Sequence, residues 1–138
     1  MLFGAKLYNA FYSIKQQISD YLLDLFSYLF VKIYLIILIL INLSLWLIAG
    51  YINNNLNSDQ IALHYNVDFG INLIGRSGKI YIIPIISLIF AVLNLSILLS
   101  LKRNKERVFA AHILLASALA SGIILLVAIA TVYLINFR

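Results

Sequence analysis

The chain has 138 residues, of which 64% are hydrophobic and 11% are charged, with a net charge of +5 and no cysteine. Soluble domains average about 45–50% apolar and about 25% charged residues, and a domain of this size buries only about two-thirds of its chain surface. This composition excludes an ordinary soluble enzyme, a nucleic-acid-binding domain, disulfides and thiolate metal sites. It predicts a single membrane domain over residues 1–138.

The first segment, residues 3–31, has the pattern of an amphipathic helix. At about 100° per residue, its polar side chains fall within one sector roughly 100° wide. Apolar side chains occupy the remaining surface, which predicts a helix lying on the cytoplasmic face of the membrane. A second interpretation is a docking helix for a partner subunit. The polar positions are Lys6, Asn9, Ser13, Gln16, Gln17, Asp20, Asp24 and Ser27.

Three further stretches are long and apolar enough to cross a bilayer, because a spanning helix needs about 20 apolar residues. They are residues 33–52, 80–101 and 108–135. Their side chains do not alternate between apolar and polar, as those of barrel strands would. We therefore predict an all-α, multi-pass membrane protein with three transmembrane helices, the amphipathic helix and a structured outer loop over residues 53–79.

The basic residues predict the orientation of the chain. Four of them lie in the loop at 102–107, and three lie before the first span, against three on the opposite side. Since basic loops stay on the cytoplasmic side, we expect a cytoplasmic N-terminus and an extracytoplasmic C-terminus in the plasma membrane of a prokaryote. The basic residues of the loop are Lys102, Arg103, Lys105 and Arg107.

Polar and small residues inside the spans predict helix packing. Asn42 and Asn94 lie about 15 Å and about 12 Å from the cytoplasmic ends of their spans. The similar depth predicts a hydrogen bond between the two amides, of about 0.6–2 kcal/mol. Small residues four apart in the third span predict close packing against the other spans, and against a partner or a second copy. These pairs are Ala116 with Ala120, Ser117 with Ser121, and Ala118 with Gly122.

Two histidines are candidates for chemistry. His112 lies about one and a half turns inside the third span, where a packing role is one interpretation and axial ligation of haem or a chlorin is the other. His64, in the outer loop, is expected on the opposite side of the membrane and would not share that cofactor. His64 and Asp68 supply two ligands, too few for a closed metal site, so we predict no metal.

The outer loop alternates apolar and mostly polar residues from Ile61 to Leu73. This period predicts one strand or an extended interfacial segment, with turns at Gly70, Gly75 and Gly78. A lone strand cannot satisfy its backbone in lipid. We therefore expect it to lie in the headgroup zone or to pair with a strand of a partner.

Eight residues of the loop and the second span also form a pattern, namely Ile61, His64, Tyr65, Asn66, Gly70, Gly75, Lys79 and Pro84. This pattern resembles a small bacterial membrane domain of unknown function that carries an Ile-Pro-x-His-aromatic-Asn motif in toxin-immunity and signalling proteins. Ala62 stands where that motif has proline, and Asn72 where it has aspartate. The resemblance implies an extracytoplasmic loop packed on its own helices, and no known reaction.

We expect a non-catalytic subunit or accessory factor of a membrane assembly, bound to the lipid bilayer and to another membrane protein or to itself. One alternative is a haem- or pigment-binding membrane-anchor subunit that uses His112; otherwise no cofactor is expected. Another is a small transporter or channel. We do not expect an enzyme, because no nucleophile–base pair or paired carboxylates fall at one depth.

Overall fold

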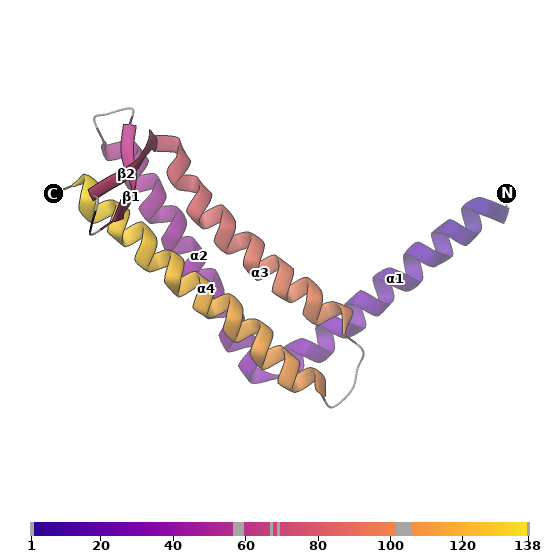
Figure 1. Ribbon diagram of the computed structural model, residues 1–138. Helices are drawn as coiled ribbons and strands as arrows, with labels where there is room; N and C mark the ends of the chain where they lie inside the picture. The colour runs from indigo at the N-terminus through magenta and orange to yellow at the C-terminus, as the bar shows by residue number, and fades with distance from the viewer. Residues whose placement is uncertain (1, 57–59, 67, 69, 102–105, 138) are drawn as a thin grey trace.

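The structure, a computed structural model, describes residues 2–56, 60–66, 68, 70–101 and 106–137. Three long helices form a bundle, a fourth leaves it at one end, and a two-stranded hairpin lies at the other end (Figure 1). In chain order the elements are α1 (Leu2–Ser27), α2 (Leu29–Asn55), β1 (Gln60–Asn66), β2 (Gly70–Arg76), the 3-10 helix η1 (Ser77–Tyr81), α3 (Ile82–Ser100) and α4 (Glu106–Asn136).

The three predicted spans are confirmed as helices long and apolar enough to cross a membrane: α2, η1 with α3, and α4. Both α2 and α4 extend past the predicted ends, α2 from Leu29 to Asn55 and α4 from Glu106 to Asn136. At about 1.5 Å per residue, α4 is roughly 46 Å long, against a hydrocarbon core of about 30 Å. Hydropathy marks only the part of a helix in lipid, whereas the helix itself continues into the headgroup region.

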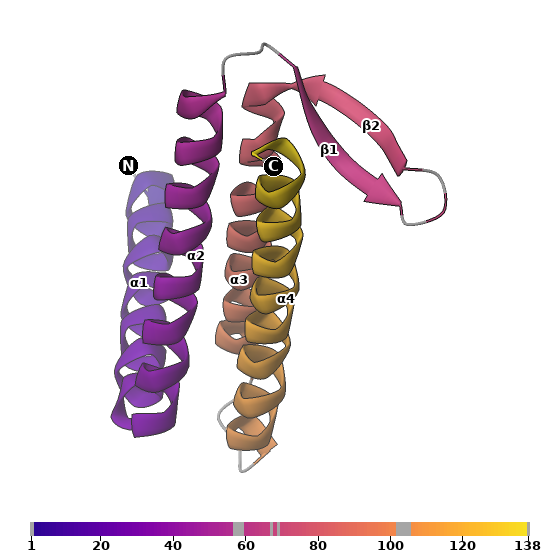
Figure 2. The ribbon, with the colours of Figure 1, turned by 90° about the vertical axis from the view of Figure 1, so that its left-hand side faces the viewer.

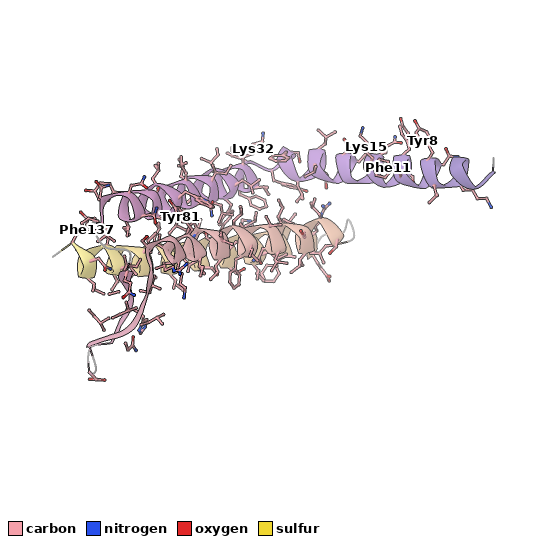
Figure 3. All side chains as sticks on the ribbon, turned by 90° about the horizontal axis from the view of Figure 1, so that it is seen from above. Tyr8, Phe11, Lys15, Lys32, Tyr81 and Phe137 are labelled. Atoms are coloured by element: carbon pink, nitrogen blue, oxygen red, sulfur yellow. The ribbon has the colours of Figure 1, made fainter. Side chains whose placement is uncertain are left out.

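The N-terminal helix α1 ends at Ser27, and a single extended residue, Tyr28 (φ −83°, ψ 122°), separates it from α2. The predicted C-terminal end of this helix, residue 31, was therefore a few residues too late. From this break α1 runs away from the bundle at a steep angle (Figure 1). From above, α1 prolongs the line of α2, and Tyr8, Phe11 and Lys15 lie on the part beyond the bundle (Figure 3).

The core has two parts along the bundle. The part next to the hairpin is built on fully buried Leu45, Ile52 and Ile129, and the part next to α1 on Leu98 and Leu115. Aromatic side chains cluster near both ends, with Tyr133 stacked on Phe137 at 4.9 Å near one and Tyr28 beside Phe30 at 5.6 Å near the other. Two aromatic zones flanking an apolar middle are typical of a membrane-embedded protein.

The outer loop folds on itself, which corrects the prediction of one continuous strand. β1 and β2 pair as an antiparallel hairpin, from Gln60 opposite Arg76 to Asn66 opposite Gly70. The chain reverses beside Gly70, whose φ of +73° lies in the left-handed region that favours glycine. The fold is therefore mostly helical with a small sheet, rather than all-α. The strands satisfy one edge of each other's backbone, so β1 finds its partner within the chain, and the outer edge of β2 stays an edge of the sheet.

Candidate functional site

Among the described residues, Asn136 at the last position of α4 hydrogen-bonds the hairpin to the end of the bundle. Its Oδ1 accepts the backbone N–H of Ala62 at 2.9 Å, and its Nδ2 donates to the carbonyl of Ala62 at 2.8 Å. The side-chain amide thus bonds to β1 as a neighbouring strand would. Beneath this clamp the side chains of Ile61 and Ile80 are buried at 1% and 0% exposure.

The second strand presents apolar side chains to the surroundings. Ile71, Leu73 and Ile74 are 51%, 53% and 60% exposed. The hairpin projects sideways from the end of the bundle that carries the C-terminus (Figure 2). Contiguous exposed apolar side chains mark interaction sites in proteins, and an edge strand is a template for pairing. β2 therefore presents an exposed apolar surface outside the bundle, as α1 also does with Tyr8 and Phe11.

Several of the predicted loop residues are brought together in this hairpin. The Nδ1–H of His64 donates to Oδ1 of Asn72 at 2.7 Å, across the point where the strand register is irregular. His64 thus bonds to the residue that stands in place of the aspartate of the resembled motif. Asp68 lies in the turn. Tyr65 and Asn66 belong to β1, but their side chains lie outside the described residues.

The predicted loop glycines differ in role. Gly70 belongs to the turn, whereas Gly75 lies within β2 opposite Ile61. A Cβ added at Gly75 would come within 2.6 Å of Leu63 Cδ1, so glycine there allows the close approach of a side chain. Gly78 lies in η1. Of the three predicted turn glycines, only Gly70 has a positive φ.

At the opposite end of the bundle, the end of α1 is joined to the start of α4 by an ion pair. Nη1 of Arg107 lies 3.3 Å from Oδ2 of Asp24, with the two side chains 4% and 18% exposed. A cavity of about 130 Å³ adjoins them. Arg107 was predicted to belong to a basic surface loop, but it is buried in the fold. Lys102, Arg103 and Lys105 lie outside the described residues.

His112 lies in α4 near this same end. Its ring stacks on Phe30 with centroids 3.9 Å apart and an interplanar angle of 16°, and meets Tyr34 edge-on at 6.0 Å. These ring contacts support the packing interpretation. His64, in the hairpin, lies at the far end of the bundle (Figure 1), as expected, so the two histidines do not share a site. Haem ligation by His112 stays a prediction.

The intramembrane amides bond to other partners than predicted. Asn42 donates to the carbonyl of Pro84 at 3.3 Å, and Asn94 accepts the hydroxyl of Ser117 at 3.1 Å. The prediction of an Asn42–Asn94 bond was wrong, because equal depth does not fix the rotation of a helix about its axis. Each amide nevertheless contacts a neighbouring helix, as predicted: Asn42 joins α2 to α3, and Asn94 joins α3 to α4.

The small residues of α4 serve both neighbouring helices. Ala118 and Gly122 are buried, and a Cβ added at Gly122 would lie 3.0 Å from Cγ2 of Ile41 on α2. Ser117 faces α3 through Asn94, and the hydroxyl of Ser121 bonds within α4. Of the remaining pair, Ala116 is half-buried and Ala120 is exposed.

Two structural side chains were missed from the sequence. Asn136 stands alone at the end of an apolar run, and its partner Ala62 is 74 residues away. Asp24 was assigned to the polar face of the first helix, but nothing local connected it to Arg107. For Asn136 a signal was available, because an isolated polar side chain at the end of an apolar segment requires a partner if it is buried.

Comparison with known proteins finds no family model that matches the chain, and no curated protein or solved structure that matches it. The resemblance of the outer loop therefore stays a prediction. What the fold defines is a class: a multi-pass membrane protein with three apolar helices long enough to span the bilayer and a small hairpin at one end of the bundle.

Proposed function

We propose that this protein is a non-catalytic binding subunit or accessory factor of a membrane assembly, and that the hairpin is its recognition element. One observation carries the proposal: an apolar strand is exposed on a hairpin that a bidentate side-chain clamp holds on the bundle. A fixed backbone lowers the entropy lost on binding, which favours recognition by this element over recognition by a bare linker.

The proposed orientation follows from the basic residues. The junction of α1 and α2 and the α3–α4 connection lie at one end of the bundle, and the hairpin and the C-terminus lie at the other (Figure 1). We place the first end at the cytoplasm, because it collects most of the basic residues. The hairpin then faces the outside, in the plasma membrane of a prokaryote, and its partner is another membrane protein or a second copy of this chain.

Purification in native lipid nanodiscs, followed by mass spectrometry, tests this proposal. We expect a partner, or a second copy, to travel with the protein. The double substitution Ile71→Ser with Leu73→Ser removes apolar surface from β2 and is expected to abolish this association. Phe11→Ser is the matched control, since Phe11 is also an exposed apolar side chain, 71% exposed, but lies on α1.

The clamp supplies a second variant. Asn136→Ala removes both hydrogen bonds to Ala62 and leaves the hairpin held by apolar packing at Ile61. This loosening is expected to weaken the association. Asn55→Ala is its control, because Asn55 is exposed and bonds only one turn back, to the carbonyl of Tyr51. Loss of the partner in Phe11→Ser but not in the hairpin variant would move recognition to α1. A monomer that travels with no partner would contradict the proposed function.

A further inference from the structure

A lateral groove runs between α2 and α3. It encloses about 370 Å³, within the range of ligand pockets, about 300–1,000 Å³. Large apolar side chains form its rim, among them Ile39, Leu43 and Val92, which are 65%, 53% and 53% exposed. Leu115 of α4, 1% exposed, closes its floor. Because the rim belongs to two membrane-spanning helices, the groove opens to the hydrocarbon of the bilayer.

One hydroxyl in this groove has no acceptor among the residues that the structure describes. Ser87 lines the groove and is only 6% exposed, and its hydroxyl makes no hydrogen bond to any described residue. Hydroxyls elsewhere on the spans, such as those of Ser44 and Ser96, bond to the carbonyl four residues back. The carbonyl of Pro84, three residues before Ser87, already accepts the amide of Asn42.

A second donor lies in the same groove, at the middle of the membrane. Asn42 is the central residue of α2 and lines the groove with Trp46. The indole N–H of Trp46 donates to Oδ1 of Asn42 at 3.1 Å, and one N–H of the amide goes to Pro84. The amide carries two N–H groups, so one more donor accompanies the hydroxyl of Ser87.

We infer that this groove binds an uncharged, lipid-soluble ligand whose carbonyl oxygen accepts hydrogen bonds from Ser87 and Asn42, with its apolar tail along the groove. A quinone with a hydrocarbon tail has this chemistry. A phospholipid acyl chain offers no acceptor at mid-membrane depth. A second transmembrane helix is disfavoured, because helices associate in membranes through small residues, and the rim is built of large ones. This inference is independent of the proposed function.

The chain supplies its own reporter, since Trp46 is its only tryptophan and lies in the groove. The probe is decylubiquinone, a benzoquinone with a decyl tail, titrated into the full-length protein in phosphatidylcholine nanodiscs. We expect saturable quenching of Trp46 fluorescence. Ser87→Ala should weaken the apparent affinity about three- to tenfold, the effect of one neutral hydrogen bond. Ala91→Phe, which fills the groove, should abolish saturation.

Ser96→Ala is the matched control, because Ser96 is an exposed serine of the same helix that bonds within it; its titration should equal that of the unaltered protein. Quenching that rises without saturation, or that is the same in all variants, would show only collision with quinone in the lipid and would overturn the inference. Stable quenching by phosphatidylcholine brominated in mid-chain, not displaced by decylubiquinone, would identify an acyl chain as the occupant and overturn it as well.

Discussion

At the scale of single residues, the hairpin depends on the backbone conformation of Gly70. A left-handed conformation costs an L-residue with a Cβ about 1–2 kcal/mol, and a Cβ added at Gly70 would meet nothing within 4 Å. We therefore expect Gly70→Ala to destabilise the hairpin by about that amount through the backbone alone. Hydrogen exchange of the β1 and β2 amides measures the change.

Gly78→Ala is the control for this substitution. An added Cβ there also meets nothing within 4 Å, but Gly78 has no positive φ. Faster exchange in Gly70→Ala and unchanged exchange in Gly78→Ala would support the assignment. Equal exchange in both variants would show that the turn does not depend on the left-handed conformation.

The sequence correctly predicted that the Asn42 and Asn94 amides lie within the bundle and contact other helices. It did not predict which helix residue each amide would meet. The rise per residue placed Asn42 and Asn94 inside the bundle, where both contact a neighbouring helix. The direction in which each amide points depends on the rotation of its helix about the helix axis. For α2, this rotation brings Ile41 against Gly122 of α4. That packing is a property of the whole bundle, and no local pattern contains it.

At the scale of elements, the Asp24–Arg107 pair joins α1 to the bundle beside the buried side chain of Leu25. Removing one partner of a buried ion pair is strongly destabilising, because it leaves the other charge buried without compensation. We expect Asp24→Asn to lower the free energy of unfolding by about 3 kcal/mol. The measurement is thermal unfolding in detergent, together with hydrogen exchange in the last turn of α1.

The matched substitution is Asp20→Asn, one turn earlier on α1, where the aspartate is exposed. It removes the same charge without touching Arg107 and should leave the unfolding temperature nearly unchanged. If both variants lost the same stability, the net charge of α1, rather than the ion pair, would be the cause.

Element prediction was best for helices and worst for the loop. The apolar runs are continuous, so α2, α3 and α4 followed from hydropathy alone. The alternation from Ile61 to Leu73 does not stop at the point of reversal, so period alone could not separate one strand from two. Gly70 correctly indicated a turn, but the alternation that continues across it indicated a single strand. The pairing of β1 with β2 therefore could not be predicted from the sequence pattern.

At the scale of the whole molecule, the proposed sidedness can be measured, because the chain has no cysteine of its own. A cysteine introduced as Gly78→Cys lies at an exposed site of η1, and one introduced as Glu106→Cys lies at the exposed start of α4. In intact cells we expect a membrane-impermeant thiol reagent to label Gly78→Cys. Glu106→Cys should react only after permeabilisation.

The reverse result would invert the orientation while leaving the fold unchanged, since the structure places these two sites at opposite ends of the bundle without assigning a side. Hydropathy and charge thus predicted the number of spans and a direction for them. The contacts that join the parts, Asn136 with Ala62 and Asp24 with Arg107, could not be predicted, since each depends on two segments that meet only when the bundle forms.

The Asn136 clamp also has a consequence for the order of events during synthesis. Ala62 leaves the ribosome 74 residues before Asn136, which at about 5–20 residues per second is a delay of roughly 4–15 s. A two-stranded hairpin alone is marginally stable. The nascent hairpin therefore lacks its two hydrogen bonds to Asn136 until α4 has inserted and its last residue has reached the same end of the bundle. Insertion of the final span and attachment of the hairpin to the bundle are therefore one event.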